Sequence, residues 1–400
     1  MTKPAILHII TRLDLGGAQK SCLALIAHLQ QNYPDFDVYL ISGSRGELVP
    51  QAQNLQNVQL LDTLIWEIHP KNLVLELKNF LKLVLIMRKL QIKHKKLIIH
   101  THTIKAGTLG RWAAWVAGVK IRVHTIHGFS FHPYQNKLVW LIFYLIELFN
   151  SLITTHFICV SSQDLNAGRE IFPKFAQKSS IIRAATLYRP QGCSNIPGPG
   201  FAQGYAGQAM VSVLRSKKYR IQPVTTPQII TIGTIASLKP GKNLFELLKA
   251  FKFAQKQLKS HSITLHLQIV GDGPLRPALE AYLTHHHLTS TVQITGWTPN
   301  PMLYAQKWSS FVFTSLWEGL PCALVEIKEL EIPILAYQVG GLPDLIDQSR
   351  LICPPKWLML ANQLVQSQLN PQNQPTRPTS PDFYIPKMAQ DHIKLYKSLL

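Results

Sequence analysis

The chain has 400 residues, of which 46% are hydrophobic, and this length predicts two domains that each bury a large core. Its 41 lysines and arginines against 21 acids give a formal net charge of +20, so we expect an acidic partner such as an anionic membrane surface or a phosphorylated substrate. The chain has no aromatic-basic interleaving, which argues against nucleic acid. Five scattered cysteines form no C-x-x-C pair, which excludes a disulfide framework and indicates a reducing compartment.

The N-terminal part alternates short apolar runs with helical patterns. Helices are predicted from about Ala18 to Gln31 and over 70–93, 105–118 and 136–153. Continuous apolar strands between helices predict an α/β domain over residues 1–188, with a parallel sheet covered on both faces. The predicted strands are "AILHII", "DVYLIS", "LIIHTH", "IRVHTIH", "HFICVS" and "SIIRAAT".

Two segments of this half bear on membranes. The run "LVWLIFYLIELFN" breaks at Glu147 after nine apolar residues, well short of the ~20 that a spanning helix needs, and predicts a core or interfacial helix. The basic cluster "MRKLQIKHKKL" at 87–97 is typical of a helix that lies on a membrane surface, with an ordinary solvated helix as the alternative. The N-terminus shows no signal peptide, so we expect a cytoplasmic protein, peripheral on the inner face of the cytoplasmic membrane.

The second half repeats the alternation. Residues 189–227 are rich in Pro, Gly, Gln and Ser and are predicted to be a linker or surface loop. A second series of strands and helices predicts another doubly wound domain over 228–386. A final amphipathic helix at 387–400 is expected to pack back on the N-terminal domain. Two such domains predict a cleft at which the carboxyl ends of their strands face each other.

Glycines and histidines mark the predicted strand ends of the first domain. Gly16 and Gly17 lie where a strand ends and a helix begins, which suits close approach of a ligand, although a structural turn is the alternative. The histidines lack the nearby carboxylates expected around metal-bound imidazoles, so we expect no metal. Hydrogen bonding to a polyhydroxylated or phosphorylated ligand fits better, with His127 the best placed, while His100 and His124 could be neutral core residues. The other histidines at these ends are His102 and His132.

In the second domain, "GTIASLKPGKN" at 233–243 follows a predicted strand. It places Lys239 and Lys242 beside a glycine at a helix start. A lysine with free backbone N–H groups suits a diphosphate. A solvated lysine in a surface turn is the alternative.

The stretch "TSLWEGLPCALVEIKEL" contains two carboxylates, Glu318 and Glu326, seven residues apart. Pro321 suits the first turn of a helix, so the helix is predicted to begin near it, with Glu318 in the preceding loop and Glu326 on the second turn. The helix start and Gly319 would cradle an anion, and each carboxylate could accept hydrogen bonds from a diol. A nucleotide sugar has this arrangement of ribose, diphosphate and hexose. The alternative is a helix cap at Glu318 and a solvated Glu326.

This stretch resembles the E-x7-E motif of the retaining glycosyltransferases of family 4 (glycosyl transferases group 1), which have the GT-B fold of two Rossmann-like domains around a central cleft. Further similar motifs follow in order, and the resemblance covers nearly the whole chain except 189–227 and 366–385. They are "LGGAQ", "HTHTIKAGTLGR", "HTIHGFSF", "FICVSS", "GTIASLKPGKN", "VGDGPLRPALE" and "VGGLPDLI".

The resemblance implies a metal-independent, cofactor-free enzyme that transfers a hexose from a nucleoside-diphosphate sugar with retained configuration and front-face attack. The implied acceptor is a glycan or lipid-linked glycan of cell-surface polysaccharide or lipopolysaccharide biosynthesis. Glu318 would contact the donor hexose at the reacting centre, and His127 would lie beside it. The implied donor-binding groups are Glu326 at the ribose, Lys242 at the diphosphate, the glycine loop of Gly16 and Gly17, and the backbone around Gly319, Leu320 and Pro321.

Two positions depart from the family pattern. Ser237 stands where the family commonly has an arginine that binds phosphate, and Gln19 replaces a carboxylate. These losses keep open a catalytically degenerate binding or scaffold protein. A sugar-nucleotide epimerase on the same fold is the other alternative, because one fold can host several chemistries.

Overall fold

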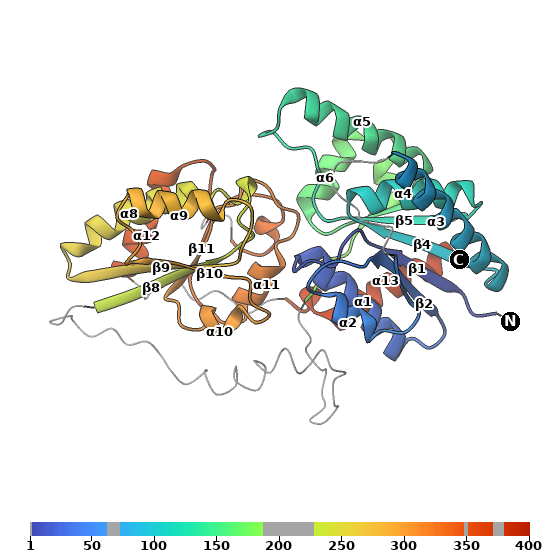
Figure 1. Cartoon of the computed structure of the whole chain (residues 1–400), viewed down its shortest axis with the longest axis horizontal. Helices are drawn as coiled ribbons and strands as arrows, with labels where there is room; N and C mark the ends of the chain where they lie inside the picture. The colour runs from blue at the N-terminus through green and yellow to red at the C-terminus, as the bar shows by residue number, and fades with distance from the viewer. Residues whose placement is uncertain (1, 62–72, 187–227, 348–350, 371–379) are drawn as a thin grey trace. The chain divides into compact units, whose positions relative to one another are not determined.

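The structure is a computed structural model of the whole chain (Figure 1), and it describes residues 2–61, 73–186, 228–347, 351–370 and 380–400. The predicted linker at 189–227 lies outside the described residues. Two compact units are present. Unit 1 comprises Met1–Pro190, Gly319–Cys322 and Ser380–Leu400, and unit 2 comprises Gln191–Glu318 and Ala323–Thr379.

Unit 1 contains a sheet of seven parallel strands in the order β3-β2-β1-β4-β5-β6-β7. The order reverses between β1 and β4, so the chain leaves these two neighbours in opposite directions. The strands are β1 (Ala5–Ile9), β2 (Asp37–Gly43), β3 (Val58–Leu61), β4 (Leu97–His102), β5 (Ile121–Ile126), β6 (His156–Cys159) and β7 (Ser179–Ile181). The helices are α1 (Gly17–Asn32), α2 (Val49–Gln53), α3 (Leu73–Lys93), α4 (Ile104–Val116), α5 (Lys137–Ile153), α6 (Ser162–Ile171) and α13 (Ile385–Leu399).

Unit 2 contains a second parallel sheet of six strands in the order β10-β9-β8-β11-β12-β13, which reverses between β8 and β11. The strands are β8 (Gln228–Ile235), β9 (Ile263–Val270), β10 (Val292–Gly296), β11 (Ser310–Phe313), β12 (Ile334–Tyr337) and β13 (Leu351–Ile352). The helices are α8 (Leu244–Lys259), α9 (Arg276–His285), α10 (Met302–Ala305), α11 (Cys322–Lys328) and α12 (Trp357–Leu369), with the 3-10 turns η3 (Pro240–Lys242) and η4 (Leu342–Asp344).

Burial on both faces explains the strand sequences. Every residue of β4 is buried, although the strand includes two histidines and a threonine. Strands covered on both sides carry continuous apolar runs instead of alternating ones, and this is the pattern from which they were predicted. The prediction of two doubly wound parallel-sheet domains is therefore confirmed, and the pair has the GT-B fold.

The last helix, α13, packs against α1 within unit 1. Its buried residues recur at helical spacing and form one face. Among them are His392 and Tyr396, which bring polar groups into the core of unit 1. Within the described residues, no helix has the length and hydropathy that a membrane-crossing segment needs.

Candidate functional site

The predicted binding residues of unit 2 lie where its strand order reverses. Lys242 ends η3, which follows β8, and Glu318 lies in the loop after the neighbouring strand β11. Ligands of doubly wound sheets bind at this position because the loops after the two strands diverge there. The Lys242 ammonium and the Glu318 carboxylate form an ion pair, and both side chains keep some exposure to solvent.

Backbone and ring contacts fix the two loops against each other. The Thr314 hydroxyl donates a hydrogen bond of 2.9 Å to the Lys242 carbonyl, and the Leu316 amide donates one of 2.9 Å to the Gly241 carbonyl. A side chain at Gly241 would meet the ring of Trp317 at 2.6 Å, so this glycine allows the close approach. Lys242 is therefore held at the end of β11 by its main chain, independently of its ion pair.

Glu326 differs from Glu318 in its surroundings. The helix α11 begins at Cys322, directly after Pro321, so the predicted helix start is confirmed and Glu326 lies on the second turn. Glu326 is only 5% exposed, and within the described residues its carboxylate has no hydrogen-bond or ion-pair partner. Its oxygens are not among the buried side-chain atoms that lack a partner, so the carboxylate reaches solvent at the end of a buried side chain, where it can accept hydrogen bonds. The side chain is too buried for the predicted alternative of a solvated Glu326.

The remaining predicted residues of this region are described by their burial. Gly319, Leu320 and Pro321 connect Glu318 to α11, and Leu320 and Pro321 are buried. Lys239 is exposed just before η3, so it stands in solvent beside the position of Ser237.

In unit 1 the predicted glycines also lie at the reversal of strand order. The chain leaves β1 and reaches Gly16, which caps α1 in an extended conformation, and Gly17 is the first residue of that helix. The N-cap residue Gly16 supplies no side-chain hydrogen bond to the start of α1. The first N–H groups of a helix lack internal partners, so they face the region where a ligand of this sheet would bind.

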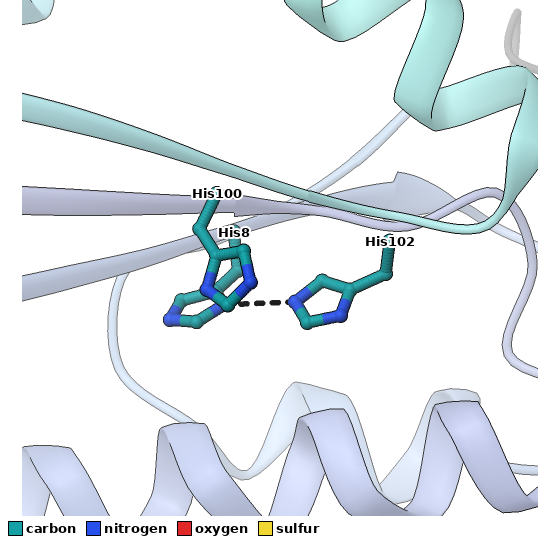
Figure 2. Close-up of side chains that lie close together, drawn as sticks. All are labelled: His8, His100 and His102. Atoms are coloured by element: carbon teal, nitrogen blue, oxygen red, sulfur yellow. Dashed lines mark hydrogen bonds between the residues drawn. The ribbon is translucent and has the colours of Figure 1, made fainter. Parts of the chain in front are cut away.

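A group of histidines lies beside these glycines, at the same reversal. His8 on β1 is the register partner of His100 on β4, and His102 lies two residues further along the same face. Figure 2 shows the three rings projecting to one side of the strands, with a hydrogen bond between His8 and His102. His8 Nδ1 lies 3.2 Å from His102 Nε2, and His102 Nδ1 lies 3.2 Å from Nε2 of His127. The rings of His8, His102 and His127 thus form a hydrogen-bonded chain that begins in the core. It ends at His127, which follows β5 and is partly exposed.

The positions of the ring protons follow from this chain of bonds. His8 Nε2 is buried and has no hydrogen-bond partner among the residues that the structure describes. A buried N–H without an acceptor is rarer than a buried acceptor without a donor, so we infer that His8 carries its proton on Nδ1. It then donates to His102 Nε2, and His102 in turn donates from Nδ1 to His127 Nε2. A neutral His127 is thereby left with its proton on Nδ1.

Three rings of the cluster lie close enough together to share a metal ion. One ligand nitrogen from each of His8, His100 and His102 lies within 4.8 Å of the other two. Five of the six ring nitrogens already form hydrogen bonds, and two of these bonds join the His100 ring to the hydroxyls of Tyr396 at 2.6 Å and Thr125 at 2.7 Å. An ion bound by all three rings would break at least two of these bonds, so the arrangement fits a hydrogen-bond network better than a metal centre.

Burial keeps these rings neutral. From an ordinary value of 6.5, burial lowers the pKa of His8 to about 3 and the pKa of His127 to about 4. Burial, followed by repulsion from neighbouring histidines, holds the pKa values of His100 and His102 well below that value. The prediction that His100 is a satisfied core residue is confirmed.

His8, His392 and Tyr396 were not predicted to belong to this group. The spacing of His8 in "AILHII" gives no signal, because only the strand register places it beside His100. His392 and Tyr396 come from the last helix, and Tyr396 is 296 residues from its partner His100. Such neighbours are set by tertiary packing.

Comparison with known proteins identifies similar chains. The family model described as "Glycosyl transferases group 1" matches residues 217–377, and that described as "Glycosyltransferase Family 4" matches residues 15–182. The chain is 29% identical to the UDP-Gal:alpha-D-GlcNAc-diphosphoundecaprenol alpha-1,3-galactosyltransferase of Escherichia coli, over 85% of this chain and 81% of that relative. It is 25% identical to the putative glycosyltransferase EpsF of Bacillus subtilis, over 86% and 79% of the two chains.

A solved structure shares the fold of the chain. The crystal structure of Anabaena Alr3699/HepE in complex with UDP and glucose aligns with a TM-score of 0.72 and 16% identity, over 99% of this chain and 100% of that one.

The buried histidines predict a steep loss of stability in acid. Their folded pKa values lie below the unfolded value of 6.5, so their full contribution is present above that pH and is lost as the pH falls toward the folded values. For each histidine that stays neutral in the folded protein, the free energy of unfolding decreases by about 1.4 kcal/mol for each unit by which the pH falls in this window. Hydrogen exchange of the β1 and β4 amides, followed in urea titrations at several pH values from 7 to 5, would measure how the free energy of unfolding changes with pH.

The matched variants are His124→Asn and His261→Asn. His124 is buried, and burial lowers its pKa to about 3, whereas His261 is exposed. The first substitution should reduce the pH dependence of the free energy of unfolding, and the second should leave it unchanged. Equal slopes for both variants and the unmodified chain would contradict the assignment of neutral buried rings.

Proposed function

Because the chain belongs to the glycosyl transferases group 1 family and has the GT-B fold, we propose that it transfers a hexose from a nucleoside-diphosphate sugar with retained anomeric configuration. The acceptor is a glycan or lipid-linked glycan of cell-surface polysaccharide or lipopolysaccharide biosynthesis, reached at the inner face of the cytoplasmic membrane.

One observation carries this proposal. Glu326 has a side chain that is only 5% exposed and a carboxylate without a protein partner in the described residues, in the unit where Lys242 and Glu318 flank the reversal of strand order. A ligand that fits must offer hydroxyl donors to one carboxylate and negative charge to a lysine. A nucleoside-diphosphate sugar offers both, through its ribose and its diphosphate.

The names of similar proteins support the substrate classes. The Escherichia coli relative is named for a UDP-galactose donor and a diphosphoundecaprenol acceptor. Structures of Anabaena Alr3699/HepE contain UDP, or UDP with glucose. A relative from Staphylococcus aureus is named for capsular polysaccharide biosynthesis.

In the proposed donor site, Glu326 accepts hydrogen bonds from the ribose hydroxyls and Lys242 binds the diphosphate. Lys242 is paired with Glu318, so a donor diphosphate exchanges one anionic partner of the lysine for another. This exchange releases Glu318 to contact the hexose. The backbone of Gly319, Leu320 and Pro321 contacts the donor sugar or phosphate.

The proposed reaction needs charge stabilisation at the leaving group. The bond between the anomeric carbon and the diphosphate oxygen breaks, and the acceptor oxygen bonds to that carbon on the same face. The acceptor proton passes to the departing diphosphate. Lys242 and backbone N–H groups stabilise the charge that develops there, so the proposal includes no metal ion and no other cofactor.

The residues of unit 1 have supporting roles in this proposal. Gly16 and Gly17 leave the start of α1 open to the diphosphate. His127 lies beside the transferred hexose, and His102 and His8 are positioning residues that fix the proton of His127 on Nδ1. His127 then acts as a hydrogen-bond donor to a sugar oxygen.

The exposed side of α3 supports the proposed location. Leu81, Leu85 and Ile92 alternate there with Lys82, Lys89 and other cations. Apolar side chains interleaved with lysines match a helix that lies on an anionic bilayer better than a uniformly solvated face.

Glu326→Ala and Lys242→Ala should each weaken donor binding by roughly tenfold or more, because each removes a hydrogen-bonding or charge-assisted contact. A thermal-shift screen of nucleotide sugars selects the donor, since stabilisation follows occupancy. Calorimetry then measures its affinity for the variants. Glu329→Ala, just past α11, is the control and should keep the affinity of the unmodified chain. Unchanged affinity in both site variants would argue against this donor site.

His102→Phe should lower kcat by up to roughly tenfold with little change in the KM of the donor, because it removes one hydrogen bond that orients His127. The nitrogen-15 spectrum of the His127 ring should then show a mixture of both neutral tautomers instead of the Nδ1-protonated form alone. His102→Asn, whose amide can replace the donor, should restore part of kcat. A full kcat in His102→Phe would show that the positioning is unnecessary.

Replacing Lys93, Lys95 and Lys96 together by Gln should reduce binding to anionic liposomes, because each cation near the bilayer adds to the attraction to anionic lipids. Flotation at low and high salt measures the loss. Binding that equals the unmodified chain at both salt concentrations would discard the role of this basic segment.

A further inference from the structure

The helix α5 carries an apolar stripe on its exposed side. Leu138 is 65% exposed and Leu152 is 73% exposed. Between them the exposed Ile142, Leu145 and Phe149 follow at intervals of three and four residues, so all five lie on one side of the helix.

Glu147 and Asn150, polar residues in the second half of α5, point the other way, into unit 1. Glu147 forms an ion pair of 2.9 Å with Arg111 of α4, whose side chain is fully buried. Asn150 accepts a hydrogen bond of 3.0 Å from Trp112 and donates one of 2.9 Å to Thr108. A helix on the surface of a soluble protein shows the reverse arrangement, with charged groups outside and leucines inside.

The rest of the inner side of α5 is also apolar. Trp140, Phe143, Tyr144 and Leu148 pack against the core cluster that includes Phe131 and Phe157. The helix is therefore apolar on nearly all sides, which is typical of a helix that is buried in protein or in lipid. In the described structure its outer side is covered by neither.

The charges on the neighbouring helices α3 and α4 indicate which kind of partner covers the outer side of α5. The helix α4 packs against both α3 and α5 and exposes Trp115. The sequences of these three helices contain only two acids, and both are ion-paired to α4, Glu76 with Lys105 and Glu147 with Arg111. The remaining charges of these helices are all positive: Lys78, Lys82, Arg88, Lys89, Lys93 and Lys137.

We propose that the outer side of α5 inserts into the apolar layer of an anionic lipid bilayer, with the cations of α3 at the headgroups and Trp115 at the interface. The 17 residues of α5 span about 25 Å, less than the ~30 Å of a hydrocarbon core, so the helix lies along the surface instead of crossing it. A second copy of the chain is the less suitable occupant, because a symmetric pair would bring two basic α3 helices together. The inference deepens the proposed function, since it rests on a membrane-bound acceptor for its biological role.

Vesicle sedimentation tests the proposal. The full chain should bind vesicles of phosphatidylglycerol and phosphatidylcholine, and bind vesicles of phosphatidylcholine alone more weakly. The variant with Leu145→Gln, Phe149→Gln and Leu152→Gln should lose at least about tenfold in partition coefficient, because three inserted side chains become polar. The control carries Ile229→Gln, Leu303→Gln and Leu358→Gln, three exposed apolar positions of unit 2, and should bind as the unmodified chain does.

Three further measurements separate the outcomes. Calorimetric donor affinity should be unchanged in the α5 variant, so failure of vesicle binding is distinguished from failure of the proposed donor site. Thermal unfolding checks the fold, and Leu152→Gln alone serves if the triple variant unfolds. Sedimentation velocity without lipid should show the same mass for the unmodified chain and the variant. A dimer that the variant converts to a monomer, or vesicle binding equal in all variants, would overturn the proposal.

Discussion

The all-parallel pairing of both sheets is the constraint from which the candidate site follows. Parallel strands end at one edge, and the edge opens only where neighbouring strands send their chains in opposite directions. In unit 1 this happens between β1 and β4, and in unit 2 between β8 and β11. In unit 1, Gly16 lies on the connection after β1 and His102 ends β4; in unit 2, Lys242 lies on the connection after β8 and Glu318 on that after β11. Within each unit, residues distant in sequence thus lie at one reversal of strand order without any local signal that joins them.

The same constraint explains why so much of the fold was predictable. Strands buried on both faces need unbroken apolar runs, and these runs stand out in sequence between helical patterns. The short elements α2 and β3 were not predicted, because four or five residues are too few to show a period. The start of α11 was predictable because a proline fits only the first turn.

What the sequence could not supply is orientation. The periodicity of 136–153 predicted a helix but not which side faces the protein, because α5 is apolar on nearly every side. The orientation of α5 is fixed by contacts with α4. Glu147 and Asn150 point inward because they bind Arg111, Trp112 and Thr108. His8 was missed for a related reason, since its role depends on strand register with β4.

The scarcity of acids gives the placement of each one unusual weight. In a chain with a net charge of +20, Glu147 neutralises a fully buried arginine and Glu318 holds a lysine at a strand end. Both pairs lower the cost of a cation that the fold places away from bulk water. Glu326 has no such cation within the described residues, although lysines and arginines are twice as numerous as acids. The acids therefore differ in kind: Glu147 and Glu318 are bound to cations of the protein, whereas the carboxylate of Glu326 can accept hydrogen bonds from neutral donors, as the proposed donor site requires.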